Sequence, residues 1–325
     1  MKLEDTGEAR DLNESIQQLS INELQDGKLE NDQVCDSTTC VLVLGMAGSG
    51  KTTFLDQVSK QCNDAVFVNL DPAVVGTLPY NCQIDIRNSV NYRDVMRNYK
   101  LGPNGSILTC LNLFATRIYD MIKLIREKKP TIVFVDTPGQ IEVFTWSASG
   151  SIILDSLASE MPTTIAYIVD VPRCTSNAIT FISNMMYACS VMYRSKLPII
   201  TILNKNDIVH HQQILDWISN FDDFQQALDR QESVDQNYAY SLARSLSLAL
   251  DEFYNLLKAV GFSSLTGNGW TEVQDAIQHA RNEYINDFLP YYEKLKKSTK
   301  ERNEQMGSSN VHIGTPSYFQ PSSDK

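Results

Sequence analysis

A glycine-rich segment directly after an apolar run constrains the fold of this chain more than any other feature. The run Cys40–Leu44 reads CVLVL, and Gly45–Thr53 follows it with the sequence GMAGSGKTT. This segment fits the pattern G-x-x-x-x-G-K-[ST], and a helical pattern over Thr52–Gln61 comes next. A strand, a glycine-rich loop and a helix in this order bind phosphate, because loop N–H groups and the helix N-terminus face the anion. The chain is therefore expected to bind a nucleotide.

Each fixed position of this loop has a chemical task. We expect Lys51 to reach the β- and γ-phosphates, and the Thr52 hydroxyl to ligate Mg²⁺. The predicted nucleotide-binding residues of the loop are Gly48, Ser49, Gly50, Lys51, Thr52 and Thr53. The alternative, a glycine-rich turn with an incidental lysine, leaves the strand before the loop and the helix after it as coincidences.

Apolar runs alternate with helical patterns along the chain, which predicts an α/β fold. Runs without polar alternation suit parallel strands that are covered on both faces. Strands joined by helices indicate right-handed crossovers and a mainly parallel sheet flanked by helices. The predicted strands are Cys40–Leu44, Ala65–Leu70, Thr131–Val135, Thr164–Val169 and Leu197–Leu203. The predicted helices are Thr52–Gln61, Asn91–Tyr99, Leu111–Glu127, Ile152–Ser159, Ser176–Tyr193, Gln212–Asp229, Tyr238–Ala259 and a long one from Trp270 to about Arg302.

The composition predicts three segments. Residues 1–39 hold ten acidic and three basic side chains and no aromatic residue, which predicts a disordered acidic extension. Residues 40–302 form the predicted folded domain with helical insertions, and residues 303–325 form a predicted disordered tail rich in Ser, Pro, Asn and Gly. The N-terminus lacks the apolar core of a signal peptide, and no apolar run approaches membrane-spanning length. A soluble intracellular protein without membrane contact is expected.

Charge and cysteine content narrow the function further. The 325-residue chain has a net charge of −11, so direct binding to a nucleic-acid backbone is not expected. Its seven cysteines include no CxxC pair and are interpreted as reduced thiols. His210 and His211 are adjacent, but no Cys/His spacing fits a zinc cluster. We expect no metal other than Mg²⁺.

A second motif, Asp136–Gln140 with the sequence DTPGQ, follows the third predicted strand. An acidic residue at this strand end is placed to hold Mg²⁺ directly or through water, which predicts Asp136 as a metal ligand. Gly139 is predicted to donate its backbone N–H to the γ-phosphate, so that the segment senses this phosphate. On its own the motif also fits a β-turn with Pro and Gly.

A third motif, N-K-x-D at Asn204–Asp207, ends the fifth predicted strand and is the guanine-recognition element of GTPases. Guanine presents a ring N–H and an exocyclic NH₂, and the Asp207 carboxylate can accept both. Adenine presents an acceptor at one of these positions, so GTP and GDP are the expected ligands. Lys205 is expected over the base plane, Asn204 on the phosphate loop, and Leu265 beside the base. The alternative is a charged turn after a strand.

With these motifs in order, the chain resembles the GPN-loop GTPases, which are named after the triplet found here at Gly102–Asn104. The segments GMAGSGKTT, NLDPA, LGPNG, DTPGQIE, WSASG and NK-D are similar to those of the first eukaryotic paralogue, over about residues 40–300. Position 46 is Met, unlike the lysine of deviant Walker ATPases. The resemblance implies a P-loop GTPase fold of the signal-recognition-particle and MinD-like (SIMIBI) class.

The resemblance also implies catalytic residues and a dimer. In the family, the GPN loop of one subunit enters the nucleotide site of its partner, so Gly102, Pro103 and Asn104 would act in trans. The implied catalytic residues are Asp71, Gln140, Glu142 and Asn104, of which Asp71 and Gln140 would position the attacking water and Glu142 would support them. A stiff turn at Gly102 and Pro103 would present the Asn104 amide. Without the resemblance, this segment is an ordinary surface turn.

The expected function is hydrolysis of GTP to GDP and phosphate with Mg²⁺ as a conformational switch. The resemblance implies a homodimer or a heterodimer with a paralogue, contact with RNA polymerase II subunits or assembly factors, and cytoplasmic localisation with shuttling to the nucleus. One alternative is a nucleotide-gated scaffold with negligible turnover. Another is a nickel-type metallochaperone GTPase, whose expected metal-binding segment is not found in this sequence.

Two segments have several interpretations. The spacing of apolar residues over Leu12–Ile21 fits a nuclear export signal, a docking helix and a neutral tail. The basic run Lys294–Arg302 fits a solvated helix end or a contact with a polymerase or import factor.

Overall fold

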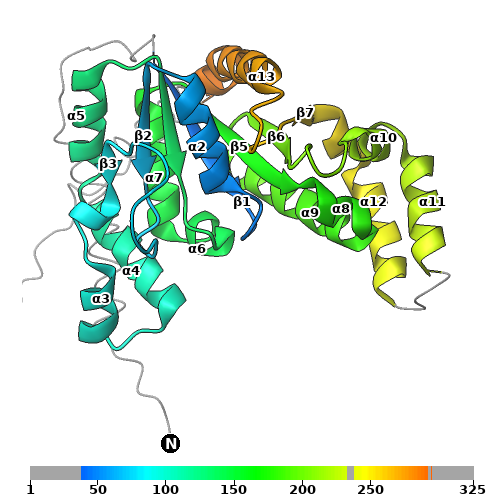
Figure 1. Ribbon diagram of the computed structural model, residues 1–325, viewed down its shortest axis with the longest axis horizontal. Coiled ribbons are helices and arrows are strands. Elements are labelled where there is room, and N and C mark those ends of the chain that lie inside the picture. Colours follow the sequence, from blue (N-terminus) through cyan, green and yellow to red (C-terminus); the bar gives the residue numbers. More distant parts are fainter. Residues whose placement is uncertain (1–37, 233–237, 292–293, 295–325) are drawn as a thin grey trace, which may run out of the picture.

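The computed structural model describes residues 38–232, 238–291 and 294. Its centre is a seven-stranded sheet in the order β3-β2-β4-β1-β5-β6-β7, and every neighbouring pair is parallel (Figure 1). The strands are β1 (Thr39–Gly45), β2 (Ala65–Asn69), β3 (Ile84–Asp85), β4 (Ile132–Asp136), β5 (Thr163–Asp170), β6 (Ile199–Asn204) and β7 (Lys258–Gly261). The five predicted strands and the parallel α/β architecture are confirmed, whereas β3 and β7 were not predicted.

Helices cover both faces of this sheet. They are α2 (Lys51–Gln61), α3 (Tyr92–Asn98), α4 (Pro103–Ala115), α5 (Ile118–Lys128), α6 (Ile141–Thr145), α7 (Ala148–Glu160), α8 (Val171–Ser176), α9 (Ala178–Ser195), α10 (Gln212–Ser219), α11 (Phe221–Glu232), α12 (Tyr238–Leu256) and α13 (Trp270–Glu283), with a 3₁₀ turn at Ile86–Asn88 and a π turn at Tyr284–Phe288. Val41 and Val43 of β1 pack in a core with α2 and α13, while Leu42 and Leu44 pack in a second core with α4, α5, α7 and α9. Alternate side chains of one strand thus enter two cores, as expected for a strand buried on both faces.

The carboxyl ends of the strands meet at one edge of the sheet and carry polar residues. The parallel register places Asn69 of β2 beside Asp136 of β4, and Asp170 of β5 beside Asn204 of β6. Between these two pairs, β1 ends at Gly45 and continues into α2. Ligands of open parallel sheets bind outside the carboxyl ends of the strands. The fold therefore gathers the predicted motifs at this edge.

Several predicted helix boundaries were wrong, and three of the predicted helices differ most from the structure. The segment Leu111–Glu127 forms two helices, because α4 ends at Ala115 and α5 begins at Ile118. Gln212–Asp229 is divided at Asn220, whose side-chain oxygen accepts the N–H of Asp222 at 3.1 Å and starts a second helix. Tyr238–Ala259 ends as a helix at Leu256, since the chain joins the sheet as β7 two residues later.

The segment Leu101–Gly105 is also different from the predicted turn. Gly102 is the N-cap of α4, with φ −74° and ψ 174°, and Pro103 is the first residue of the helix. Proline suits this position because its fixed φ matches the helix and its missing N–H would have no intrahelical partner there. Asn104 therefore stands in the first turn of a helix rather than in a loop.

Other predictions fall partly on residues outside the described ranges. These include all of segment 1–39 except Thr38 and Thr39, the whole of segment 303–325, the stripe Leu12–Ile21, and the basic run after Lys294. The helix predicted from Trp270 is described as α13 and the π turn that follows it. None of the helices in the described ranges has the length and apolar character needed to span a bilayer. The six cysteines described there are free.

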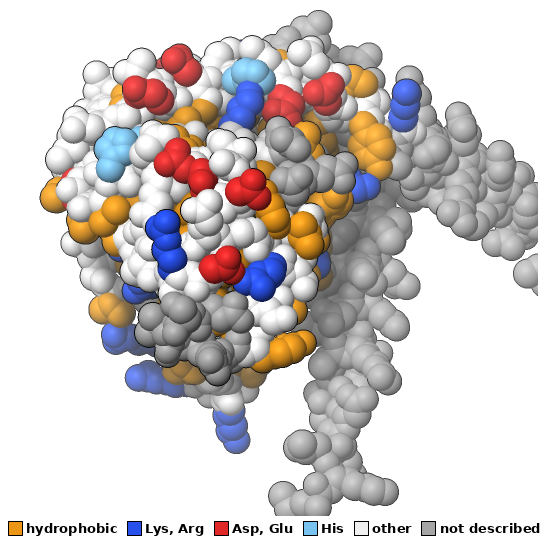
Figure 2. Space-filling view, turned by 90° about the vertical axis from the view of Figure 1, so that its right-hand side faces the viewer, with side chains coloured by type: hydrophobic (Ala, Val, Ile, Leu, Met, Phe, Trp, Pro, Cys, Tyr) orange, Lys and Arg blue, Asp and Glu red, His pale blue; other side chains and the backbone are white. Residues whose placement is uncertain are grey.

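The face formed by α10, α11 and α12 carries side chains of mixed character (Figure 2). Acidic and basic groups are scattered over it, with hydrophobic side chains between them. The exposed apolar residues of α12 include Tyr238, Leu242 and Leu248. This face therefore presents no continuous basic surface.

Candidate functional site

The loop between β1 and α2 has a backbone that only glycine allows at two positions. Gly45 has φ +150°, and a Cβ atom there would lie 2.5 Å from the carbonyl oxygen of Ile168 in β5. Gly50 has φ +96°, and its Cβ would lie 2.5 Å from Asn204 Nδ2. Both distances are far below van der Waals contact, so any side chain would displace the loop. The glycines of the motif thus bring the loop against β5 and β6.

Lys51 places its ammonium group inside this loop. Its Nζ donates to the carbonyl oxygens of Gly45 at 2.7 Å and Met46 at 3.3 Å, and the residue is buried. Burial lowers the pKa of Lys51, while the nearby carboxylates of Asp136 and Asp71 raise it. A cation that is held beside loop N–H groups can bind phosphate oxygens, as predicted for Lys51.

Thr52 and Asp136 lie close enough to share a cation. Thr52 Oγ1 donates to Asp136 Oδ2 at 3.4 Å, and the hydroxyl of Tyr80 donates to the same oxygen at 3.0 Å. Within the described residues, Asp136 Oδ1 is buried and has no hydrogen-bond partner. Burial raises the pKa of Asp136 to about 6, so the carboxyl is mostly ionised at neutral pH. An ionised carboxylate with an open oxygen beside a hydroxyl fits Mg²⁺, which prefers oxygen ligands.

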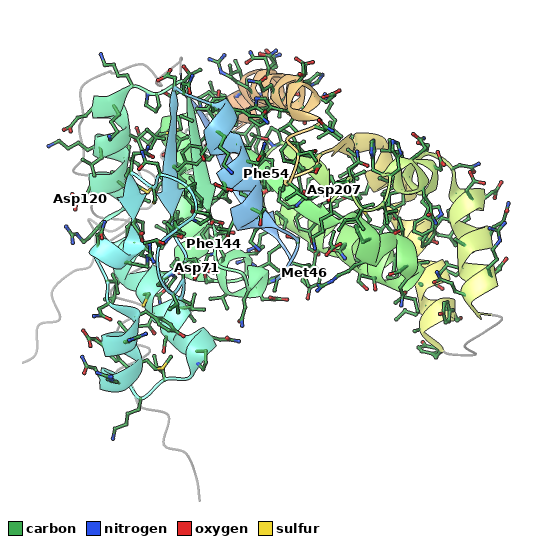
Figure 3. All side chains as sticks on the ribbon, in the orientation of Figure 1. Met46, Phe54, Asp71, Asp120, Phe144 and Asp207 are labelled. Carbon is green, nitrogen blue, oxygen red and sulfur yellow. The ribbon has the colours of Figure 1, made fainter. Side chains whose placement is uncertain are left out.

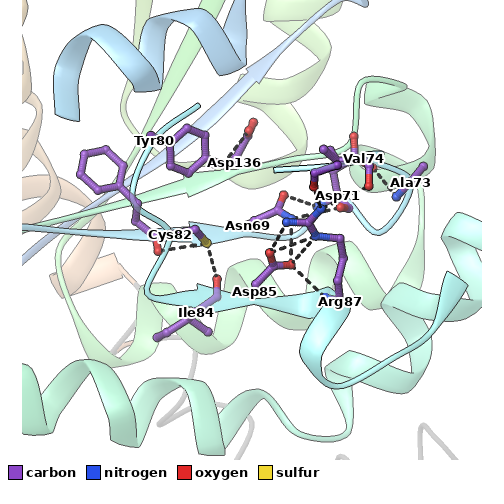
Figure 4. A network of polar contacts seen from close by, with 12 residues as sticks. Asn69, Asp71, Ala73, Val74, Tyr80, Cys82, Ile84, Asp85, Arg87 and Asp136 are labelled. Atoms are coloured by element: carbon purple, nitrogen blue, oxygen red, sulfur yellow. Dashed lines mark hydrogen bonds and ion pairs between the residues drawn. The ribbon is translucent and has the colours of Figure 1, made fainter. Parts of the chain in front are cut away.

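Asp71 lies in the loop after β2, at the same edge of the sheet. The Oδ1 atom of Asp71 accepts the N–H of Ala73 at 2.9 Å (Figure 4). The side chain of Asn69 accepts the backbone N–H of Asp71 and donates to the backbone carbonyl of Asp71. Burial raises the pKa of Asp71, against the effect of the N–H groups of Ala73 and Gly139 and the charge of Lys51. The structure therefore brings together Asp71, Gly139 and Lys51. The Gly139 N–H bonds the Asp71 carboxylate here, so its bond to the γ-phosphate stays a prediction.

An ion pair fixes the loop that carries Asp71. The Arg87 guanidinium donates to both oxygens of Asp85, with Nη2 to Oδ2 at 2.6 Å (Figure 4). Its Nη1 also donates to the carbonyl oxygens of Gly76 at 2.7 Å and Val74 at 3.3 Å. Because Asp85 is the last residue of β3, this pair ties the loop to the sheet.

The other predicted catalytic residues lie at the surface. Gln140 and Glu142 are exposed at the start of α6, and Asn104 is exposed in the first turn of α4. Glu142 Oε1 accepts the hydroxyl of Tyr187 at 3.0 Å, which directs this carboxylate toward α9. Gly102 and Pro103 are exposed as well. The structure places these residues without joining them to Asp71, and their catalytic roles stay predictions.

The base-recognition loop is bonded to the phosphate loop. Asn204 Nδ2 donates to the Ser49 carbonyl at 2.9 Å, and Asn204 Oδ1 accepts the N–H and hydroxyl of Ser264 at 3.1 and 2.7 Å. The predicted tie between Asn204 and the phosphate loop is confirmed. Asp207 is exposed, with Oδ1 accepting the hydroxyl of Ser263 at 2.6 Å, and Leu265 is 76% exposed. Asp71 and Asp207 lie on either side of the loop between β1 and α2 (Figure 3).

Three residues of this edge were not predicted. Asp170 ends β5 and pairs with Lys205, whose Nζ lies 2.6 Å from Asp170 Oδ2. Arg173, in the helix after β5, donates to the carbonyl of Ala47 at 3.4 Å. Tyr80 bonds Asp136. Asp170 has the same signal as Asp136, an acidic residue at the end of an apolar strand, whereas no sequence pattern singles out Tyr80.

Comparison with known proteins is consistent with this geometry. A family model described as "conserved hypothetical ATP binding protein" matches residues 43–283. The GPN-loop GTPase 1 of Schizosaccharomyces pombe is 45% identical over 279 residues, which cover 82% of this chain and 76% of that protein. The corresponding protein of Saccharomyces cerevisiae is 44% identical over 284 residues, which cover 83% and 73%. This chain belongs to the GPN-loop GTPase family.

A solved member of the GTPase fold supports the architecture. A GTPase from Pyrococcus abyssi in its apo form superposes with a TM-score of 0.64 at 24% identity, over 75% of this chain and 98% of that protein. The predicted P-loop GTPase fold is thereby confirmed. In this GPN-loop GTPase, the triplet that gives the family its name is the N-cap and first two residues of α4.

Proposed function

We propose that this protein hydrolyses GTP to GDP and phosphate in a Mg²⁺-dependent reaction and acts as a dimeric switch. The bridge made by Asn204 carries the proposal. This side chain holds the phosphate loop through Ser49 and the base loop through Ser264 at the same time. A purine and its phosphates would therefore meet two elements that are fixed relative to each other.

The base is guanine rather than adenine, although the matching family model is described by ATP binding. Asp207 presents a carboxylate at an exposed position that the Ser263 hydroxyl orients. A carboxylate accepts the two N–H donors of guanine and would face a lone pair of adenine. Competition of GTP and ATP for the purified protein tests this choice, and preference for ATP would contradict it.

The residues of this chain would divide the chemical work among them. Lys51 and the N–H groups of the loop would bind the β- and γ-phosphates, and Thr52 with Asp136 would hold the metal. Mg²⁺, when bound, would neutralise charge on the phosphate oxygens. Asp71 would orient the attacking water and accept a hydrogen bond from it, while Gly139 would donate its N–H to the γ-phosphate. Phosphoryl transfer needs this positioning and charge stabilisation more than covalent help.

The exposed positions of Asn104, Gln140 and Glu142 favour completion of the site by a second subunit. A dimer would bring Asn104 from the start of one α4 helix to the phosphates bound by the other subunit. The partner would be a second copy of this chain or a paralogous GPN-loop GTPase. The helix fixes the backbone of Asn104, so only the rotamer of its side chain would have to be ordered when the subunits meet.

Membership of the family supports a cellular role in the assembly and nuclear import of RNA polymerase II. The proposed partners are polymerase subunits or assembly factors, and the proposed location is the cytoplasm with shuttling to the nucleus. Purification of the tagged protein with GTP or GDP, followed by identification of bound proteins, tests this role. Recovery of the same proteins with both nucleotides would contradict a switch.

Phosphate release tests the catalytic proposal against a nucleotide-gated scaffold with negligible turnover. Wild-type protein is compared with Gln140→Ala and Asp71→Ala at saturating GTP and Mg²⁺. The enzyme predicts that both variants release phosphate at least about tenfold more slowly while they still bind GTP. Equal, slow release from all three proteins would favour the scaffold.

A further inference from the structure

Three consecutive carbonyl groups of the phosphate loop each accept a hydrogen bond from a side chain at another strand end. The pairs are Arg173 Nη1 with Ala47 O at 3.4 Å, Lys205 Nζ with Gly48 O at 3.0 Å, and Asn204 Nδ2 with Ser49 O at 2.9 Å. In a trans peptide unit the C=O and the next N–H point in opposite directions. Donors that hold the carbonyl groups of Ala47 and Ser49 outward therefore direct the N–H groups of Gly48 and Gly50 toward the phosphate side, while the N–H of Ser49 donates to the Met46 carbonyl within the loop at 3.1 Å.

A single buried carboxylate holds two of these donors. The Asp170 side chain is 8% exposed, and its Oδ2 lies 2.6 Å from Lys205 Nζ and 3.4 Å from Arg173 Nε. Its Oδ1 accepts the backbone N–H of Arg173 at 3.3 Å, which fixes the start of α8. A buried carboxylate is costly without such partners, so both cations are drawn to one point beside the loop.

The local backbone agrees with this arrangement. Lys205 has φ +66°, a left-handed conformation that is unfavourable for a residue with a side chain and that persists where the surroundings determine it. Gly48 has φ +80°, and a Cβ atom there would lie 3.5 Å from a guanidinium nitrogen of Arg173. The Arg173 side chain thus lies over the outer face of the loop at Gly48.

We propose that Asp170 and Arg173 are positioning residues for phosphate binding. Asp170 anchors Arg173 and Lys205, and these two cations fix the carbonyl groups of Ala47 and Gly48. The loop N–H groups are then ordered before a nucleotide arrives, so less conformational entropy is lost on binding. This inference rests on the proposed nucleotide binding, and it is independent of hydrolysis and of dimer formation.

The test measures how much affinity the β-phosphate adds. Dissociation constants for GMP and GDP are determined by competition with a fluorescent GDP analogue, and their ratio is compared between variants. We expect Asp170→Asn to lower the ratio of the GMP constant to the GDP constant about tenfold, because both cations lose their anchor. Arg173→Ala, which removes one donor, should lower it about threefold, and Arg173→Lys should recover part of this loss.

An exposed ion pair at the start of α5, outside the candidate site, supplies the control for the arginine substitution. Arg117 Nε lies 3.2 Å from Asp120 Oδ2 in an i,i+3 pair, and the Arg117 side chain is 59% exposed, against 64% for Arg173. Arg117→Ala should leave the ratio unchanged. In the double variant, the two substitutions together should lower the ratio by less than the product of their single effects, because Arg173 acts through the anchor that Asp170 provides. Full additivity, or an unchanged ratio in folded Asp170→Asn, would overturn the proposal.

The outcomes separate this inference from the proposed function. If the protein prefers adenine nucleotides, the proposed guanine recognition is wrong. The ratio of the AMP and ADP dissociation constants then still tests whether Asp170 positions Arg173 and Lys205 on the phosphate loop. If Asp170→Asn melts far below the wild type, the exposed Arg173→Ala variant decides. Binding of neither nucleotide family by the wild type would overturn both proposals.

Discussion

The two sides of the candidate site differ in how completely one chain builds them. On the side of β5 and β6, buried side chains bond the phosphate loop to the base loop, as Asn204 does between Ser49 and Ser264. On the side of α4 and α6, the residues assigned to water and phosphate charge are exposed, as Asn104 and Gln140 are. The side chains that join the two binding loops are thus buried, while Asn104 and Gln140 stand at the surface.

This difference separates affinity from turnover. A preorganised binding site requires few changes when the nucleotide arrives, so a single chain is sufficient to bind it. Catalysis requires donors aimed at the transition state, and exposed side chains lose rotamer freedom before they can act. Substitutions in the phosphate loop and on the side of β5 and β6, here called the binding side, should therefore change nucleotide affinity. Substitutions on the side of α4 and α6, here called the hydrolysis side, should change turnover.

Lys51→Ala should have the largest effect on the binding side. The Lys51 ammonium is buried among loop carbonyl groups, where its charge is poorly screened. We expect the affinity for GTP and GDP to fall about a thousandfold, measured by calorimetry. Lys60→Ala, in the exposed last turn of α2 and outside the loop, should bind almost as the wild type does. A loss of less than about tenfold in Lys51→Ala would contradict the assignment of the loop.

Asp207→Asn should change the base preference on the same side. The amide offers one acceptor and one donor in place of two acceptors, so it no longer complements the two donors of guanine. We expect GDP affinity to fall about a hundredfold while xanthosine diphosphate, with a carbonyl at the second position, binds better than to the wild type. Equal loss for both nucleotides would indicate a structural defect of the loop instead of a changed base preference. Ser263→Ala, which removes only the hydrogen bond to Asp207, is the control for such a defect.

Buried parallel strands made most of the binding side predictable. Each of β1, β4 and β6 is a continuous apolar run, and each leads into a recognisable motif at Gly45, Asp136 or Asn204. Two strands were not predicted because they are short: β3 has two residues, and β7 is a half-buried edge strand of four residues. Such segments carry too few residues for a hydrophobic pattern.

The hydrolysis side was less predictable because its residues are positioned by tertiary contacts. Gly102 and Pro103 were interpreted as a turn, although proline at a first helical position is also a helix-start signal. The direction of Glu142 toward Tyr187 depends on the packing of α6 near α9, which no local pattern encodes. Asp170 was predictable in principle, since it ends an apolar strand as Asp136 does.

Asn104→Ala should affect turnover without affecting affinity. The side chain is exposed in one chain, so its removal leaves the binding side intact. We expect phosphate release at saturating GTP to fall about thirtyfold, with GTP affinity within about twofold of the wild type. Mixing this variant with Lys51→Ala sharpens the comparison, because a mixed dimer pairs one intact nucleotide site with one intact Asn104. Recovery of activity on mixing supports action in trans, and its absence, with dimers formed, contradicts it.

Tyr80→Phe should have the smallest effect, because it removes one hydrogen bond at the boundary of the two sides. The Tyr80 hydroxyl donates to Asp136 and lowers the pKa of that carboxyl, although burial keeps it raised to about 6. The bond therefore stabilises the ionised carboxylate of the folded state. We expect the nucleotide-free variant to lose about 1 kcal/mol in the free energy of unfolding above pH 7. The loss should diminish as the pH falls through about 6, where the carboxyl takes up a proton in the folded state. Urea unfolding at pH 7.5 and pH 5 measures both values, and a loss that is equal at the two pH values would show that the Tyr80 hydroxyl acts independently of the charge on Asp136.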